Sequence, residues 1–536
     1  MSSFIPATAP FNEEQRAWLN GFFSGLMGVQ GNATTSDALE AAGFASDVIT
    51  GPAPPEEEED FQWHDSSLPI VDRMELADGK PLERKLMAAM AQLDCGSCGY
   101  VCQIYAEAIA SGDETNLTLC SPGGKDTKQM IKRLLKDEGS AESSAASASA
   151  SNGKANGNGN GTTTGYSRAN PFTAKLIESR PLNKEGSAKD TRHVAIDLAG
   201  SGLSYHVGDA LGVFPSNCDE LVASVIDQIG ADPNLNVTTS AGLTKTLRVA
   251  IGEDYCLKDP TDELLSLIID RVDDDAKRSM LKTMADEGVP EGYDVLDVLE
   301  VADCRSLTAT EFLETLDPLN PRLYSIASST KVVGDEVHLT IGKVVYEREG
   351  RTRKGVASTM LADRVESGSS VRVFVQPNHG GFTVPTDTTK PIIMVGPGTG
   401  IAPFVAFLQE RAATKATGKN WLFFGDQHEA YDFLYEDELK ANVANGFLTR
   451  LDTAFSRDGE AKVYVQDRMR ENAAELWQWL GEGASLYVCG DASRMAADVE
   501  RALIDVAENQ GKLSTADAQA FVKKLAADGR YVRDVY

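Results

Sequence analysis

The last third of the chain, from about residue 390, alternates short apolar runs with helical patterns, and this alternation constrains the fold more than any other feature. The runs PIIMVG, NWLFFG, TRLDTAFS and SLYVCG predict buried strands, and helical periodicity follows them. Parallel strands need a long crossover, usually a helix. We therefore expect a doubly wound α/β sheet over residues 389–536, a fold that binds nucleotides at the carboxyl ends of its strands.

The first of these strands leads into MVGPGTGIAPF, a glycine-rich turn before a helix. Glycines allow the backbone to approach a pyrophosphate, and the helix N-terminus offers unpaired N–H groups. The turn residues expected to bind a nucleotide are Gly396, Gly398, Thr399 and Gly400. A tight turn that binds no ligand is the alternative interpretation.

A basic and hydroxylic cluster, AFSRDGEAKVYVQ, follows the third predicted strand. Ser456, Arg457 and Lys462 suit a 2′-phosphate, whereas a site selective for NAD is expected to carry an acid for the free 2′-hydroxyl. Tyr464 and Gln466 lie close behind in the sequence. The cluster therefore favours NADPH, and the alternative is a solvated basic patch.

Residues 169–388 contain short β-rich runs, interrupted over about 218–318 by a helical block. This pattern predicts an antiparallel β-barrel with a helical insertion. In RLYSIASS, Arg322 suits a diphosphate, the Tyr324 ring suits an isoalloxazine, and Ser325 suits a flavin nitrogen. Residues 355–358, GVAS, precede a helix and again suit a pyrophosphate. An ordinary strand with a buried tyrosine is the alternative to a flavin site.

Four of the eight cysteines lie within residues 61–138, with the spacing Cys95-x2-Cys98-x3-Cys102-x17-Cys120. Amphipathic helices are predicted on both sides of them. Residues 139–168 are rich in Ser, Gly, Ala and Asn and predict a flexible linker. Disulfides, a zinc site and an iron–sulfur centre are all open readings of the four thiols.

Net charge and the lack of targeting segments limit the possible partners and location of the protein, and with them the chemistry of the four thiols. The net charge of −29 argues against nucleic acid or a membrane surface as partner. The sequence contains no run of about 18 apolar residues, so we expect no transmembrane helix. The N-terminus lacks the features of a signal peptide, so we expect a cytoplasmic protein, in which disulfides are rare. Residues 1–51 are expected to form a helical docking or oligomerisation segment, followed by an acidic, proline-rich linker.

The ordered motifs RLYS, GVAS, GPGTGIAPF, SR…KVYVQ, YVCGDASRMAADVE and GRYVRDVY resemble the ferredoxin-NADP reductase-like module of diflavin reductases, and most of all the flavoprotein (alpha) subunits of NADPH sulfite reductase. The resemblance implies residue roles. For FAD the implied residues are Arg322, Leu323, Tyr324, Ser325, Thr340, Ile341, Gly342, Tyr346, Gly355, Val356, Ala357, Ser358 and Tyr536, the last stacked on the flavin. For NADPH they are Ser456, Arg457, Lys462, Val463, Tyr464, Val465, Gln466 and Asp498. Ser325, Cys489 and Asp534 would surround the hydride path, as catalytic residues.

The chain departs from that family before residue 169, where the cysteine segment stands in place of a flavodoxin-like FMN domain. CGSCGYVCQIYAEAIASG…CSPGG resembles the small [4Fe–4S] domain of corrinoid iron–sulfur proteins, with a second gap of three residues here instead of four. Structural zinc sites more often pair two separated C-x2–4-C knuckles. We therefore favour a [4Fe–4S] cluster on Cys95, Cys98, Cys102 and Cys120, with zinc as the alternative.

The expected function is an NADPH-dependent flavoprotein subunit that passes electrons from FAD to the cluster and on to a sirohaem-containing sulfite reductase. One alternative keeps the enzyme and changes the acceptor to a nitrite or nitrate reductase or a ferredoxin-like carrier. Another is a zinc-stabilised interaction module fused to a diaphorase domain.

Overall fold

The computed structural model describes residue 63 and residues 68–92, 100, 102–112, 114, 116–120, 122–141, 165–303, 307–348, 350–378, 380–492 and 494–536, with side chains in helix α6 up to residue 137. The segment predicted to dock or oligomerise, residues 1–51, and most of the predicted linker lie outside these residues. So do Cys95 and Cys98. Two compact units are distinguished along the chain, and residues 63–536 form the second.

The alternation after residue 390 forms the predicted parallel sheet, in the strand order β13-β12-β11-β14-β15. Its strands are β11 (Ile392–Val395), β12 (Asn420–Asp426), β13 (Arg450–Phe455), β14 (Ser485–Gly490) and β15 (Tyr531–Val535). Its helical elements are η4 (Gly398–Ile401), α15 (Ala402–Ala413), α16 (Glu429–Asp432), α17 (Glu436–Ala444), α18 (Val465–Glu471), α19 (Ala473–Gly481), α20 (Met495–Gly511) and α21 (Thr515–Ala527).

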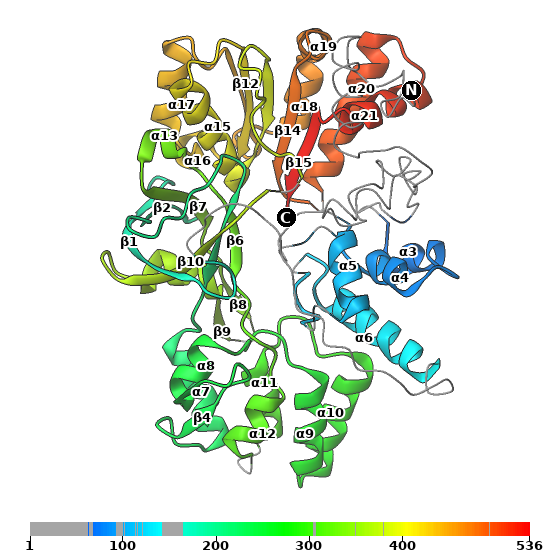
Figure 1. Ribbon diagram of the computed structural model, residues 1–536, viewed down its shortest axis with the longest axis vertical. Coiled ribbons are helices and arrows are strands. Elements are labelled where there is room, and N and C mark those ends of the chain that lie inside the picture. Colours follow the sequence, from blue (N-terminus) through cyan, green and yellow to red (C-terminus); the bar gives the residue numbers. More distant parts are fainter. Residues whose placement is uncertain are drawn as a thin grey trace, which may run out of the picture. The chain divides into compact units, whose positions relative to one another are not determined.

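The three central strands of this sheet, β11, β12 and β14, are buried on both faces because helices cover each side. Ile392, Leu422 and Tyr487 pack on one side against α15 and α17. Ile393 and Trp421, one residue out of phase, pack on the other side against α18 to α21. Figure 1 shows α15 and α17 on one side of β12 and β14, and α18 to α20 on the other. Burial on both faces explains why these strands are nearly continuous apolar runs.

The β-rich region forms a six-stranded antiparallel sheet in the order β6-β3-β10-β1-β2-β7. Its strands are β1 (Phe172–Pro181), β2 (Thr191–Asp197), β3 (Ala210–Phe214), β6 (Arg322–Ser325), β7 (Glu336–Gly342) and β10 (Ser370–Gln376). In the described residues the ladder does not close into the predicted barrel. Its two end strands instead meet at one isolated bridge, between Ile326 and Leu339.

The predicted helical insertion lies between β3 and β6 and has an apolar core of its own. Its elements are α7 (Asp219–Ile229), β4 (Asn236–Thr238), β5 (Thr244–Thr246), α8 (Leu247–Glu253), α9 (Asp262–Arg271), α10 (Asp275–Glu287), α11 (Val295–Ala302) and α12 (Ala309–Glu314). After β6 come α13 (Thr330–Val333), the hairpin of β8 (Val345–Arg348) and β9 (Arg351–Lys354), and then α14 (Val356–Thr359) and η3 (Met360–Arg364).

The described part of the cysteine segment is helical, with α3 (Ile70–Leu76), α4 (Leu82–Ala89), α5 (Cys102–Ser111) and α6 (Gly124–Ala141). Two of these, α4 and α6, are the amphipathic helices that the flanking sequences predict. Nowhere in the described part of the chain is a helix both long and apolar enough to span a membrane.

Candidate active site

Three residues from three strands meet where the two sheets approach each other. Ser325 ends β6, and its Oγ donates a hydrogen bond of 2.7 Å to Oδ2 of Asp534 in β15. The Sγ of Cys489, in β14, lies 3.9 Å from the same carboxylate oxygen. These are the three residues predicted to surround the hydride path. The structure brings them together, while their catalytic role stays a prediction.

Burial sets the protonation behaviour of this trio. Burial raises the pKa of Asp534, and the hydrogen bonds from Ser325 and Cys489 oppose that rise. Burial and the charge of Asp534 raise the pKa of Cys489 well above its usual value. The Cys489 thiol therefore keeps its proton and acts as a weak donor to the carboxylate.

The glycine-rich turn reaches the same place from the opposite side. A side chain at Gly400 would put its Cβ 2.1 Å from the carbonyl oxygen of Cys489, so only glycine lets η4 lie on β14 this closely. The next contact is between side chains, because Thr399 Oγ1 and the Tyr536 hydroxyl are 2.8 Å apart. Tyr536 is 52% exposed, so much of its ring is accessible. The turn predicted to bind nucleotide thus adjoins the residue predicted to cover the flavin.

The predicted flavin residues come from β6 and from the turn after β9. Arg322, Leu323 and Tyr324 are partly buried, and desolvation raises the pKa of Tyr324 to about 12. A Cβ on Gly355 would lie 2.6 Å from Ser358 Oγ and 2.8 Å from Val344 Cβ. Ser358 Oγ accepts the Val344 N–H at 3.1 Å, which closes the turn. These residues fit a flavin site, because they combine a guanidinium, an aromatic ring and a backbone turn without room for a side chain.

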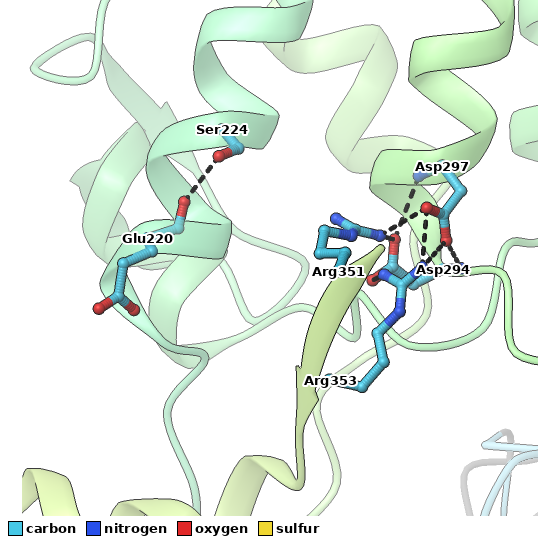
Figure 2. Close-up of polar contacts among 6 residues, drawn as sticks. All are labelled: Glu220, Ser224, Asp294, Asp297, Arg351 and Arg353. Carbon is cyan, nitrogen blue, oxygen red and sulfur yellow. Dashed lines mark hydrogen bonds and ion pairs between the residues drawn. The ribbon is translucent and has the colours of Figure 1, made fainter. Parts of the chain in front are cut away.

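An ion-pair network anchors the hairpin that carries Tyr346, another predicted flavin residue, to the helical insertion. Figure 2 shows Arg351 and Arg353 of β9 directed at Asp294 and Asp297 at the start of α11. Arg353 Nη1 lies 2.6 Å from Asp294 Oδ2, and its Nη2 lies 2.7 Å from Asp297 Oδ2. The two acids also form the capping box of α11. Since an isolated hairpin is only marginally stable in water, these pairs fix its position.

Replacing Arg351 with methionine should loosen this hairpin but leave part of the ion-pair network, because Arg353 still pairs with Asp294 and Asp297. Arg351 Nη2 bonds both acids, so its loss should lower the free energy of unfolding by about 1–3 kcal/mol. The Kd for FAD should rise by about tenfold, since the hairpin leads into Gly355. Fluorescence titration of the apoprotein with FAD measures this. Arg348→Met, in the same hairpin, is the matched control, and equal FAD affinity in both variants would contradict the anchoring role.

Two predicted flavin residues on β7 have other roles in the structure. Thr340 Oγ1 is 2.7 Å from the hydroxyl of Tyr435, which stands just before α17 in the nucleotide domain. His193 Nδ1 lies 3.1 Å from the same hydroxyl, and burial lowers the pKa of His193 to about 3. The side chain of Ile341 belongs to the core of the antiparallel sheet. Thr340 therefore links the two domains, and its part in FAD binding stays a prediction.

The residues predicted to bind the 2′-phosphate lie after β13. Ser456 is tied to the end of β12, where its N–H donates to the Asp426 carbonyl at 2.9 Å. Arg457 and Lys462 are exposed, and neither has an ion pair or side-chain hydrogen bond to another described residue. Both cationic groups are therefore available to a phosphate.

The remaining residues predicted for NADPH divide by burial. Val465 is buried in the core under α18, so its side chain packs within the protein. Gln466 Nε2 donates to Asp498 Oδ2 at 3.3 Å, and Asp498 also pairs with Arg501. Tyr464 is exposed, and its N–H donates to Asp467 Oδ2 at 2.9 Å in the first turn of α18.

Arg457→Ala should raise the KM for NADPH by about tenfold to a hundredfold, because a hydrogen bond between charged groups contributes about 1.5–3 kcal/mol. The KM for NADH should change by less than about twofold, since NADH has no 2′-phosphate. Initial-rate kinetics with both nucleotides test this. Lys440→Ala, on exposed α17, is the control, and an equal effect of Arg457→Ala on the two nucleotides would refute the assignment.

One group near the glycine-rich turn is absent from the sequence predictions. Asp426 ends β12, its side chain is only 1% exposed, and it pairs with Lys189 of the flavin domain. Burial raises its pKa, and Lys189 opposes the rise. The sequence feature that could have marked Asp426 is its position as an acid at the carboxyl end of a buried strand, where ligands bind in such sheets. Its ion-pair partner is 237 residues away in sequence, so no local pattern reveals the pair.

Two of the four predicted cluster ligands are described. Cys102 is the first residue of α5, and Cys120 stands just before α6, where its carbonyl accepts the Gly124 N–H at 3.1 Å. Both are buried. In the described part of the chain, which excludes Cys95 and Cys98, no group of three or more potential metal ligands is found.

Comparisons with domain families agree with this geometry. The model of the FAD binding domain matches residues 165–360, and that of the Oxidoreductase NAD-binding domain matches residues 394–501. The chain therefore contains an FAD-binding domain followed by an oxidoreductase NAD-binding domain.

The chain is also similar to three curated proteins named "Sulfite reductase [NADPH] flavoprotein alpha-component". The protein of Bacillus subtilis (strain 168) is 46% identical over 377 residues, 70% of this chain and 62% of that protein. That of Mannheimia succiniciproducens is 46% identical over 69% of this chain and 62% of its own length. That of Neisseria meningitidis serogroup C / serotype 2a is 47% identical over 69% and 61%. The matched part thus spans about three fifths of the relatives' length.

Proposed function

We propose that this chain oxidises NADPH at bound FAD and delivers the electrons, through a [4Fe–4S] cluster on Cys95, Cys98, Cys102 and Cys120, to a sirohaem-containing sulfite reductase. The observation that carries the NADPH half is the meeting of Ser325, Asp534 and Cys489 beside Thr399 and Tyr536. It joins the predicted flavin strand β6 to the predicted nucleotide turn across two domains. The match to FAD-binding and NAD-binding domains supports the same reading.

When bound, FAD accepts a hydride and releases electrons one at a time, and a [4Fe–4S] cluster accepts and passes on one electron at a time. The protein supplies position and protonation. Ser325 presents its hydroxyl at the end of β6, and Asp534 fixes the orientation of that hydroxyl by accepting its hydrogen bond. The Cys489 thiol stays protonated behind them. Tyr536, whose hydroxyl is bonded to Thr399, would lie against bound FAD, and its ring would then have to move before nicotinamide could react there.

NADPH is the proposed substrate because of the free cationic groups after β13. Arg457 and Lys462 face solvent without a partner among the described residues, in a chain whose net charge is −29. Such an acidic surface repels a nucleotide with an extra phosphate unless cations are placed to receive it. These two residues supply that local positive charge.

The described part of the cysteine segment fits a thiolate-bound cluster. Cys102 begins a helix of ten residues, and Cys120 stands four residues before one of eighteen, so both residues lie near the N-terminus of a helix, where the dipole favours negative charge. This placement stabilises thiolates, which are the form that binds iron. A Cβ on Gly123 would lie 2.1 Å from Thr127 Oγ1 and 3.0 Å from Cys120 Sγ, so only glycine fits between these two side chains.

The acceptor is proposed from the relatives, whose printed name is that of a sulfite reductase flavoprotein component. We propose a sirohaem protein as the partner and a cytoplasmic location for this chain, with residues 1–51 as a docking or oligomerisation segment. A nitrite or nitrate reductase, or a ferredoxin-like carrier, is the second candidate, and a pull-down of the native partner separates them.

Anaerobic purification followed by metal analysis and EPR tests the proposal. We expect about four iron and four sulfide per chain and an EPR signal that appears when NADPH is added. Zinc without an EPR signal would instead establish the zinc-stabilised module. NADPH-dependent reduction of an artificial acceptor by the FAD-loaded protein tests the other half, and its absence would refute the enzyme.

A further inference from the structure

The loop before Cys120 contacts the loop before β6. Asn320 Nδ2 donates to Thr118 Oγ1 at 2.8 Å, and Asn116 Nδ2 donates to Asn320 Oδ1 at 3.3 Å. Thr118 is two residues from Cys120 in sequence. A single asparagine of the flavin-binding region thus accepts from one side of the cysteine loop and donates to the other.

Asn320 is also bonded to the flavin strand. Its carbonyl accepts a hydrogen bond of 2.9 Å from Nη1 of Arg322, the first residue of β6. The same strand contains Tyr324 and ends at Ser325. The contacts of Asn320 therefore connect the loop that carries a predicted cluster ligand with the strand that carries the predicted flavin residues.

Two ion pairs extend this contact along α6. Lys128 pairs with Asp317, three residues before Asn320, and Lys132 Nζ lies 2.8 Å from Glu263 Oε1 in α9. Lys128 and Lys132 are four residues apart, so they lie on one face of the helix. The surface they meet carries two acids, and the charges are complementary. We call Glu263, Asp317 and Asn320 the docking face.

These contacts are polar and partly exposed, which makes them easy to break. The side chains of Lys132 and Glu263 are 36% and 55% exposed. An exposed ion pair changes an equilibrium constant by at most about fivefold, and salt screens it. The predicted linker over residues 139–168 corresponds to a tether with an average span of about 27–33 Å, and such tethers give effective concentrations in the millimolar range. A low affinity of the docking face for the cysteine segment is therefore sufficient to keep the tethered segment bound for part of the time.

We propose that the docking face is the electron-receiving position of the cysteine segment, which binds there through Thr118, Lys128 and Lys132 and leaves again. This rests on the proposed function only for what the docked segment does. The docked position places the Cys120 loop next to β6, and release frees the segment to meet a protein acceptor. Docking and undocking make and break only hydrogen bonds and ion pairs. Because electrons reach the segment only in the docked position, their rate of arrival follows the docked fraction.

Charge reversal across the ion pair tests docking directly. Carbodiimide should crosslink Lys128 to Asp317 and Lys132 to Glu263 in the full-length protein, and peptide mass spectrometry detects both products. Both crosslinks should fall by at least fivefold in 1 M NaCl, because salt screens both ion pairs together. In Asp317→Lys the Lys128 product disappears with its carboxylate, and the Lys132–Glu263 product should fall by at least fivefold, because Lys128 then meets a repelling lysine in place of its partner. The Lys132–Glu263 product should return in the double variant Lys128→Asp/Asp317→Lys. Asp286→Lys, the same charge change on exposed α10, should leave both crosslinks unaltered.

Stopped-flow mixing with NADPH tests the role. Asp317→Lys should slow reduction of the cluster at least fivefold, the double variant should restore it to within twofold, and reduction of a small artificial acceptor should be unchanged in both. Missing crosslinks in the unaltered protein would overturn docking. Crosslinks that behave as expected with an unchanged rate of cluster reduction would overturn the electron-receiving role. Crosslinks that behave as expected in a protein without iron would refute the proposed cluster and the role together, and leave docking standing.

Discussion

Cys120→Ser should stop electrons from reaching a protein acceptor, with a fall of at least a hundredfold, while NADPH-driven reduction of a small artificial acceptor stays within about twofold. Serine preserves the size of this buried side chain but provides no thiolate, so a four-cysteine cluster loses a ligand. The flavin and nucleotide residues lie in domains with cores of their own, so they should keep their function. Cys98→Ser should have the same effect.

Cys218→Ser is the matched control, because this thiol lies at the N-terminus of α7, outside the cysteine segment. It should retain both activities. Iron content and the EPR spectrum of each variant distinguish a lost ligand from a general loss of folding. If Cys120→Ser reduced both acceptors at the same lowered rate, the relay through the cysteine segment would be wrong.

Asp534→Ala should slow hydride transfer from NADPH by about a hundredfold, the lower range of effects for a positioned proton-handling group. The variant removes the acceptor of the Ser325 hydroxyl and the Cys489 thiol, so Ser325 loses its fixed orientation. We expect kcat to fall with little change in the KM for NADPH, because the Asp534 carboxylate contacts Ser325 and Cys489 and not the proposed phosphate-binding residues.

The readout is the rate of flavin reduction after rapid mixing, with NADPH deuterated at the transferred position. A larger isotope effect in Asp534→Ala shows that hydride transfer itself has become limiting. Asp534→Asn keeps an oxygen that can accept from Ser325 and should recover part of the rate. Bound FAD and the midpoint of thermal unfolding should stay close to those of the unaltered protein. An unchanged rate of flavin reduction would remove Asp534 from the hydride path.

Local patterns predicted most of the regular structure. The apolar runs after residue 390 became β11, β12 and β14, because a strand covered on both faces has to be apolar throughout. The predicted strand that became β13 lies at the edge of the sheet, is only partly buried and carries Arg450 and Asp452. The flanks of the cysteine segment became α4 and α6, because their apolar residues recur at helical spacing. The prediction of a closed barrel was not confirmed, because the described strands form an open six-stranded sheet. Closure depends on how closely the end strands β6 and β7 approach each other, and local patterns do not determine that distance.

Contacts between distant segments were beyond such patterns. The pairing of Arg351 and Arg353 with Asp294 and Asp297 spans more than fifty residues, and each partner alone is an ordinary charged side chain. Asn320 has no feature in the sequence that marks it, yet it contacts both Thr118 and Arg322. The ion pair of Lys189 with Asp426 is a third example. In each case the topology selects the partner, because the two residues share no local periodicity.

The sequence by itself determined the alternation of strands and helices, the glycine-rich turn, the cationic cluster after β13 and the spacing of the four cysteines. All of these are local properties, set by side-chain periodicity and backbone freedom within a few residues. Only the tertiary structure decided that Ser325 and Asp534, 209 residues apart, form a hydrogen bond, and that Gly400 lies on the backbone of Cys489. The physical reason is that the order of the parallel strands and the packing of the two sheets bring these residues together, and both depend on burial summed over the whole domain.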